Sequence, residues 1–429
     1  MEISILYNYF KECGKVTTDT RNCPEGSMFI ALKGETFNGN AFARQALEKG
    51  CRYAVVDEAE YADAPNIFLV DNCLETLQLL AREHRRALGT PIVGITGTNG
   101  KTTTKELIAT VLQKRYKTLY TQGNLNNHIG VPLTLLNLTE EHEMAVVEMG
   151  ANHPGEIRTL VNIAEPDCGM ITNVGKAHLE GFGSFEGVVK TKSELYDYLR
   201  LKENVFIFLD KDNEVLCQAS AGLESIGYGL EGEGLCVKGK LHACAPFLSF
   251  EWEHEGVSHD VNTHLIGAYN VKNALAAIAI GCRFGVPAEA ICEALNGYIP
   301  SNNRSQLTET EDNHLIVDAY NANPTSMMAA LENFRFMEVE HKVAVLGDMK
   351  GLGEGSLDEH RKIVAFLQTC GFERTILVGV EFGKANAAFE HYPDVEAVKA
   401  LFAENKPMGK FVLIKGSNSM KLFNLKEVL

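Results

Sequence analysis

Residues 91–104 read PIVGITGTNGKTTT, and the organisation of the whole chain follows from this stretch. Its β-branched apolar run at 92–96 predicts a buried strand. The residues that interrupt this run are Gly97, Thr98, Asn99 and Gly100. A helix is expected from Lys101 onward, because apolar residues then recur at helical spacing. A strand, a glycine-rich loop and a helix that opens on Lys-Thr are the context of a phosphate-binding loop.

The chemistry of this loop favours a nucleoside triphosphate as the ligand. Glycine lets backbone N–H groups approach phosphate oxygens, and the N-terminus of a helix attracts negative charge. We expect Lys101 to contact the β- and γ-phosphates and the Thr102 hydroxyl to contact Mg²⁺, with Thr103 beside them. Ile95 replaces the first glycine of the longer G-x-x-x-x-G-K-[ST] pattern, so this is the shorter G-x-x-G-K-T form. The alternative interpretation is a glycine-rich turn without a ligand.

Composition predicts a cytoplasmic globular protein with several domains. A chain of 429 residues is too long for one hydrophobic core. The formal charge of −16 argues against nucleic acid or an anionic membrane as a partner. Eleven cysteines without a C-x-x-C pair indicate reduced thiols in the cytosol. We expect no signal peptide and no membrane insertion, because the start lacks the signal pattern and the apolar runs are short.

Strand-like and helix-like patterns alternate along the chain, which predicts an α/β fold. We expect a first domain at residues 1–88, a second at 89–300 that contains the phosphate-binding loop, and a third at 301–429. Residues 210–265 contain short strand-like pieces between turns, which predicts a small antiparallel elaboration of the second domain. In the third domain the alternation of strands and helices begins again.

Two more buried strands of the second domain lead to groups that suit a metal site. Residues 144–148 end on Glu148, and residues 168–172 lead to His178 a few positions later. Ligands of an open parallel sheet bind outside the carboxyl ends of its strands, so these side chains should lie near Thr102. Mg²⁺ prefers oxygen, so His178 is either a ligand or a hydrogen-bond partner of a metal-bound water. Each residue alone has a structural alternative.

Other polar stretches are candidates for ligand contacts, and each has a simpler interpretation. The turn Asp19-Thr20-Arg21 is typical of an ordinary surface turn. Lys192 lies early in a helix of mixed charge, which is typical of a solvated face. Asn270 stands in the first turn of an alanine-rich helix, where it can act as a cap. Polar loops supply the remaining candidates: Asn126, Asn127, Arg304, Asp318, Asn321 and Asn323.

The order and spacing of these motifs resemble one family along essentially the whole chain. The central part contains TGTNGKT, EMGANHPGEI, TNVGKAHLEGFGS, KSELY and GAYNVKNALAA, followed by an arginine and an aspartate. These motifs resemble the ATPase core of the Mur ligases of bacterial cell-wall synthesis. Further stretches resemble the members that add D-alanyl-D-alanine: TDTRNCPEGSMFIALKGETFNGNAF, VDAYNANPTSM and LGDMKGLGEGS. The D-N-P-R motif of the diamino-acid-adding members does not occur.

The resemblance implies three α/β domains: an N-terminal domain for a UDP-sugar substrate, a central P-loop domain for ATP, and a Rossmann-like C-terminal domain. It implies that Lys192 matches a lysine that is carbamylated in some members and then binds a second Mg²⁺ near His178. Two loops depart from the family pattern. Asn38-Gly39-Asn40 stands where relatives often have Asp-Gly-His, and Lys350-Gly351 replaces a more usual Leu-Glu.

The resemblance also assigns the polar candidates to ligands. Asn270, Arg304 and Asp318 resemble nucleotide contacts. The residues expected to contact the UDP-muramoyl peptide or the dipeptide are Asp19, Thr20, Arg21, Asn126, Asn127, Asn321 and Asn323.

The implied activity is an ATP-dependent ligation in cytoplasmic peptidoglycan precursor synthesis, carried out by a monomer. D-alanyl-D-alanine would be added to UDP-N-acetylmuramoyl-tripeptide through an acyl phosphate, with release of ADP and phosphate. Cations must bring the two anionic substrates together, which suits Lys101 and Mg²⁺ held by Thr102 and Glu148. The alternatives are addition of a diamino acid, and a P-loop switch without ligase chemistry.

Overall fold

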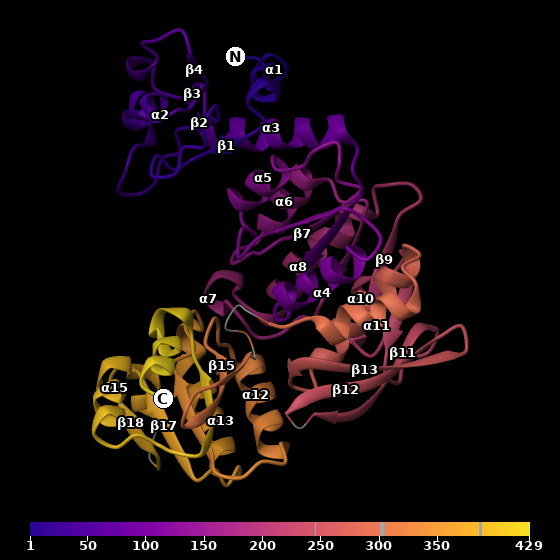
Figure 1. The fold of residues 1–429 in the computed structure, drawn as a ribbon, viewed down its shortest axis with the longest axis vertical. Coiled ribbons are helices and arrows are strands. Elements are labelled where there is room, and N and C mark those ends of the chain that lie inside the picture. The colour runs from indigo at the N-terminus through magenta and orange to yellow at the C-terminus, as the bar shows by residue number, and fades with distance from the viewer. Residues whose placement is uncertain (245, 301–303, 305, 386–387) are drawn as a thin grey trace.

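The computed structural model describes residues 1–429 except 245, 301–303, 305 and 386–387. Within the described residues, the strands form three β-sheets of four, nine and six strands. The first sheet lies above the second along the long axis, and the third lies at the lower left of the view, at the level of strands β11, β12 and β13 of the second (Figure 1). Helices pack against all three, so the predicted α/β class is confirmed. The expected domain limit at 300/301 falls where residues 301–303 lie outside the described part of the chain.

The first sheet is parallel, in the order β1-β2-β3-β4. Its longest helix is α3, which is capped at its start because Asn72 Oδ1 accepts the Glu75 N–H at 2.8 Å. Gly89 ends it in the left-handed conformation, with φ 67°. The elements are α1 (Ile3–Cys13), β1 (Val16–Thr17), β2 (Met28–Ile30), α2 (Ala43–Glu48), β3 (Tyr53–Val56), β4 (Ile67–Leu69) and α3 (Cys73–Leu88).

The second sheet has the order β13-β12-β11-β10-β9-β8-β5-β7-β6. Neighbouring strands pair in parallel from β6 across the sheet to β11, whereas β11, β12 and β13 pair antiparallel. The antiparallel elaboration expected at residues 210–265 is therefore confirmed for β11 to β13, but residues 214–219 form a helix and 224–229 a parallel strand. Its strands are β5 (Ile92–Thr96), β6 (Thr118–Tyr120), β7 (Met144–Glu148), β8 (Cys168–Ile171), β9 (Phe206–Asp210), β10 (Glu224–Gly229), β11 (Leu235–Cys244), β12 (Phe247–His254) and β13 (Val257–Ile266). Its helices are α4 (Lys101–Leu112), α5 (Gly130–Leu135), α6 (Glu156–Ala164), α7 (Leu179–Phe182), α8 (Phe185–Leu199), α9 (Glu214–Ala219), α10 (Asn270–Arg283) and α11 (Ala288–Gly297).

Each face of the second sheet has its own hydrophobic core, because side chains of a strand alternate between faces. Val93 and Ile95 of β5 pack on one face with the buried side chains of α4, α10 and α11. Ile92 packs on the other face with α5, α6 and α8. This second core continues without a break through α3 into the first sheet. The N-terminal and central parts of the chain therefore share one core.

The third sheet has the order β14-β15-β19-β16-β17-β18, and only β14 pairs antiparallel among its described strands. Two separate cores lie on its faces, one with α12 and α13 and the other with α15. The elements are β14 (Gln306–Glu309), β15 (Asn313–Asp318), α12 (Pro324–Phe336), β16 (Lys342–Gly347), α13 (Ser356–Leu367), β17 (Arg374–Val378), α14 (Val380–Ala385), β18 (Glu390–Tyr392), α15 (Val395–Glu404) and β19 (Lys410–Lys415).

Candidate active site

The glycine loop joins the end of β5 to the start of α4, as the sequence predicts. Gly97 has φ 147°, and a Cβ at this position would lie 2.0 Å from Thr172 Oγ1. Gly100 has φ 77°, and a Cβ there would lie 2.7 Å from Asn273 Oδ1. Both positions combine a backbone conformation that favours glycine with a close neighbour, so a larger residue would displace the loop.

Lys101 folds back over this loop. Its Nζ donates to the carbonyl oxygens of Gly97 at 2.8 Å and Thr98 at 3.1 Å. Asn173, which follows β8, holds the other side of the loop by accepting the N–H groups of Thr98 and Asn99. Burial lowers the pKa of Lys101 to about 8, against the opposing effect of a nearby carboxylate. Phosphate oxygens next to this ammonium would favour its charged form.

Glu148 lies at the end of β7 and is almost completely buried. Its Oε2 accepts the hydroxyl of Thr102 at 2.9 Å, and its Oε1 accepts Asn126 Nδ2 at 2.8 Å. Its backbone N–H donates to Thr121 Oγ1 at 3.0 Å, which fixes the end of the strand. A hydroxyl and a carboxylate are oxygen donors of the kind that Mg²⁺ prefers. These residues therefore fit a magnesium site beside the phosphate-binding loop.

A further charged residue of this site, Lys105, was not found from the sequence. Its side chain is fully buried, and its Nζ lies 3.7 Å from Glu148 Oε2 and 4.0 Å from Glu106 Oε1. It also donates to the Gly123 carbonyl at 3.5 Å. The available signal was its position one helical turn after Lys101, which places both lysines on one face of α4.

His178 lies just before α7 with φ 50°, in the left-handed region. Burial lowers the pKa of its imidazole to about 4, and the positive charges of Lys101 and Lys192 lower it further. The ring is therefore neutral near pH 7 and can accept a hydrogen bond or bind a metal through a nitrogen.

Lys192 is buried in α8, so the interpretation of a solvated face is wrong for this residue. Its Nζ donates to the Ala151 carbonyl at 3.3 Å and lies 5.4 Å from the centre of the Phe182 ring. Burial lowers its pKa well below the usual value, and Lys101 lowers it further. A lowered pKa favours the neutral amine, which is the form that reacts as a nucleophile.

The C-terminal domain contributes polar side chains to the same region. Asn323 Nδ2 donates to Asn99 Oδ1 at 2.7 Å and so joins α12 directly to the glycine loop. Asp318, at the end of β15, pairs with Lys415 Nζ at 2.5 Å. Lys415 is thus a second buried cation that the sequence reasoning missed.

Arg304 is the described residue nearest the start of this domain, and its guanidinium lies 3.9 Å from the centre of the Tyr320 ring. The Nε atom of Arg304 is buried and has no hydrogen-bond partner among the described residues. Asn270 does not cap α10; its Nδ2 donates to the Ile266 carbonyl at 2.8 Å, and its Oδ1 accepts Asn273 Nδ2 at 2.7 Å.

One cavity of about 880 Å³ collects most of the predicted residues. They are Gly97, Thr98, Asn99, Gly100, Lys101, Thr103, Asn126, Asn127, Glu148, His178, Lys192, Asn270, Arg304, Asp318 and Asn321. Thr102 is buried and does not line the cavity; its hydroxyl donates to Glu148, which does. Leu74 and Gln78 of α3 extend the lining toward the N-terminal domain. The cavity is at the upper end of the usual size of a ligand site, up to about 1,000 Å³.

The predicted turn in the N-terminal domain is not part of the lining. Asp19 and Arg21 pair with one another, and the Arg21 side chain is 89% exposed. This pairing lowers the pKa of Asp19 to about 2. The backbone carbonyl of Thr20 accepts Lys49 Nζ at 2.7 Å. The turn is thus an exposed, internally paired loop on the N-terminal domain.

The two loops that depart from the family pattern have structural contacts. Asn38 donates to Glu58, and buried Asn40 exchanges hydrogen bonds with Asp57, which orders the loop before α2. Lys350 pairs with buried Asp348 at 3.1 Å.

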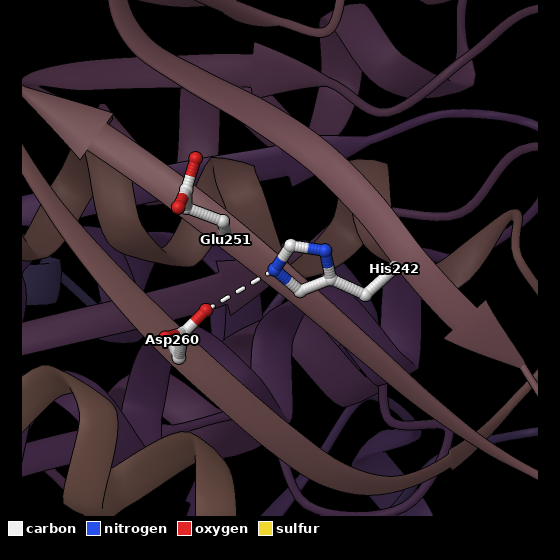
Figure 2. A group of neighbouring side chains, drawn as sticks. All are labelled: His242, Glu251 and Asp260. Atoms are coloured by element: carbon white, nitrogen blue, oxygen red, sulfur yellow. Dashed lines mark hydrogen bonds and ion pairs between the residues drawn. The ribbon is translucent and has the colours of Figure 1, made fainter.

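A second group of ligand-type side chains lies away from this cavity, on the antiparallel strands β11, β12 and β13 (Figure 2). His242 Nε2 lies 3.1 Å from Asp260 Oδ1, and Glu251 stands beside them. His242 and Asp260 are exposed. Exposed groups of this kind often gather without a metal ion, so we assign no metal to them.

The part of the chain that the structure describes contains no helix with the length and apolar character needed to cross a membrane.

Comparisons with known proteins agree with this architecture. Three family models match successive parts of the chain: the Mur ligase catalytic domain at residues 13–85, the Mur ligase middle domain at 95–281, and the glutamate ligase domain at 303–418. Two similar relatives are named UDP-N-acetylmuramoyl-tripeptide--D-alanyl-D-alanine ligase. The protein of Bacillus subtilis is 36% identical over 95% of this chain and 91% of its own length. The protein of Escherichia coli is 35% identical over 96% of this chain and 93% of its own length.

Solved structures are similar over the same extent. A crystal structure of MurF from Acinetobacter baumannii has a TM-score of 0.88 and 29% identity, covering 99% of this chain and 97% of that one. MurF ligase from Thermotoga maritima in complex with ADP has a TM-score of 0.86 and 27% identity, covering 96% of each chain. The predicted three-domain architecture is thereby confirmed. With family models along its length and full-length relatives above 30% identity, this chain belongs to the Mur ligase family.

Proposed function

We propose that this chain joins D-alanyl-D-alanine to UDP-N-acetylmuramoyl-tripeptide and converts ATP to ADP and phosphate. The observation that carries this proposal is one cavity that contains the phosphate-binding loop, the buried carboxylate Glu148 and cationic side chains of the C-terminal domain. The relatives that bear this name match it across more than nine-tenths of both chains. A nucleotide switch would not need buried cations from a separate domain.

The reaction must activate a carboxylate, because hydroxide is too poor a leaving group for direct amide formation. Transfer of the γ-phosphoryl group of ATP to the carboxylate of the tripeptide forms an acyl phosphate and releases ADP. The amine of D-alanyl-D-alanine then attacks the carbonyl carbon, the C–O bond to phosphate breaks, and the amine loses a proton. The cavity walls would limit the entry of water, which would otherwise hydrolyse the acyl phosphate.

Different residues around the loop would contact different parts of the triphosphate. Lys101 would exchange its bonds to the loop carbonyls for phosphate oxygens. Thr102 and Glu148 would hold Mg²⁺, which supplies positive charge to the β- and γ-phosphates. Each such electrostatic contact is typically worth about 3 kcal/mol in the transition state. Asn270 and Arg304 would contact the nucleotide.

Lys192 and His178 both line the cavity and would supply a second group of metal ligands. A neutral Lys192 amine can react with CO₂ to form an N–C bond and a carbamate, with release of a proton, and the carbamate would offer oxygen ligands to a second Mg²⁺. His178 would bind this ion or hydrogen-bond its water. Carbamylation is supported by the burial of Lys192 and by the backbone carbonyl, rather than a carboxylate, that its Nζ contacts.

We assign the remaining predicted residues by their positions. Asn126 and Asn127 line the cavity near Glu148 and would meet the peptide carboxylate. Asp318 would contact the nucleotide, and Asn321 and Asn323 would approach the dipeptide or the phosphates from the C-terminal domain. Asp19, Thr20 and Arg21 would contact the UDP-muramoyl group from their exposed loop. We further propose domain limits near 88 and 300, a monomeric state and a cytoplasmic location.

The test is release of ADP by the purified full chain. We expect release with UDP-N-acetylmuramoyl-tripeptide plus D-alanyl-D-alanine, and little with a diamino acid or with no amine. Preference for the diamino acid would assign the chain to that branch of the family. Equal ADP release without any amine would refute a ligase and favour a nucleotide switch. Mass spectrometry of the ligated peptide provides a second readout.

A further inference from the structure

A row of charged and polar groups leads away from Glu148 along α4, and Glu148 and Lys105 are its buried members. Lys105 Nζ lies 3.7 Å from Glu148 Oε2 on one side and 4.0 Å from Glu106 Oε1 on the other. The hydroxyl of Tyr298 donates to Glu106 Oε2. Tyr298 follows α11 and stands just before the passage into the C-terminal domain. The row therefore joins the proposed magnesium carboxylate to the end of the central domain.

The distances indicate what Lys105 contributes. At 3.7 Å, Nζ is beyond the usual range of about 2.7–3.2 Å for a hydrogen bond to oxygen, whereas Thr102 and Asn126 bond Glu148 at 2.9 and 2.8 Å. Thr102 and Asn126 thus set the orientation of the carboxylate. Lys105 provides charge, and a buried carboxylate without a nearby positive charge would be costly.

We propose that Lys105 is a positioning residue that supplies the counter-charge of Glu148 in the absence of a divalent cation, so that cation binding requires the phosphates of the nucleotide. This inference rests on the proposed role of Glu148 as a magnesium ligand. A divalent cation on Glu148 faces the positive charge of Lys105 nearby, and repulsion at low dielectric weakens its binding. The negative charges of a bound nucleotide offset this repulsion. Metal and nucleotide then bind cooperatively.

The substitution Lys105→Met removes the charge and keeps an unbranched side chain of similar length. We expect the full-length variant to bind Mn²⁺ without nucleotide about tenfold or more tightly than the wild type, measured by electron paramagnetic resonance of free Mn²⁺. The factor by which ADP tightens Mn²⁺ binding should fall correspondingly. A misfolded site would lose affinity, so this gain separates the inference from a purely structural role. Equal or weaker Mn²⁺ binding by folded K105M would overturn it.

Three more variants complete the experiment. Glu106→Gln removes a negative charge on the other side of Lys105, so free Mn²⁺ should bind more weakly than in the wild type. Lys105→Arg keeps the positive charge, so ADP should tighten Mn²⁺ binding by the same factor as in the wild type. Lys114→Met alters a lysine that lies beyond the end of α4 and pairs with Glu293. It should change neither the affinity for Mn²⁺ without nucleotide nor the factor by which ADP tightens Mn²⁺ binding. If K105M does not fold, E106Q and K105R decide: unchanged Mn²⁺ affinity in E106Q would overturn the inference.

Glu148→Gln separates this inference from the proposed function. If E148Q binds Mn²⁺ in the presence of ADP as the wild type does, the role of Glu148 is wrong, and the inference falls with it. If E148Q loses this binding but K105M gains none, only the assignment of Lys105 is overturned. If E148Q loses Mn²⁺ binding and K105M binds Mn²⁺ more tightly, the result supports the proposed roles of both Glu148 and Lys105.

Discussion

Thr102 offers the sharpest test of the proposed magnesium site, because a single oxygen atom can be removed from it. In Thr102→Val, a methyl group replaces the hydroxyl that donates to Glu148 Oε2 at 2.9 Å. A hydrogen bond to a charged group contributes about 1.5–3 kcal/mol. If the variant loses this amount from the transition state, kcat/KM for ATP should fall about 10- to 150-fold. A coupled assay of ADP release at several Mg²⁺ concentrations measures it.

The matched control is Thr110→Val on the same helix. The Thr110 hydroxyl donates at 2.8 Å to the backbone carbonyl of Glu106, one turn earlier. This acceptor is neutral and already lies in the helix, so ADP release should stay within about twofold of the wild type. The reasoning is refuted if T102V keeps wild-type kcat/KM, or if T110V loses as much as T102V does.

Three further predictions concern other parts of the molecule. Lys192→Ala should strongly lower ADP release, and acetate should partly restore it if a carbamate is the ligand; an unimpaired variant would remove the second metal role. Burial lowers the pKa of His84, so the unfolded chain takes up a proton that the folded chain excludes as pH falls below about 6.5. Urea midpoints should therefore drop between pH 7.5 and 5.5, and the drop should be smaller in His84→Gln; equal drops contradict this. Arg85→Met should lose about 3 kcal/mol of stability, because buried Arg85 donates to two carbonyls and a carboxylate. The exposed pair of Arg86 should contribute at most about 1 kcal/mol, so Arg86→Met, compared by urea denaturation, should be nearly neutral.

Local patterns were sufficient to predict most of the elements that position the site. The apolar run before Gly97 is strand β5, the run that ends on Glu148 is β7, and the helix expected at the glycine loop is α4. Buried parallel strands and capped helices leave strong periodic signals, so their existence follows from the sequence. The short edge strands β1 and β18 were not predicted, because two or three residues make no period.

The pairing of charged groups could not be predicted in this way. Lys105 and Lys415 look like ordinary surface residues in the sequence, yet both are buried beside carboxylates that are far away along the chain. Lys192 was expected on a solvated face for the same reason. Burial depends on which faces meet in three dimensions, and a single helix pattern does not contain that information. The site residues supplied by strand ends were predicted because parallel strands share a common edge.

The hydrophobic core that the N-terminal and central domains share makes the N-terminal domain harder to separate from the rest of the chain than the C-terminal domain. A chain cut near residue 88 would expose the apolar face of α3 and of the helices it covers, and both fragments would aggregate. A chain cut near 300 would divide the molecule where the cores are almost separate, since Ile266 is the one buried central residue, among those described, that joins a core of the third sheet. We therefore expect the C-terminal domain, rather than the N-terminal one, to fold when it is produced on its own.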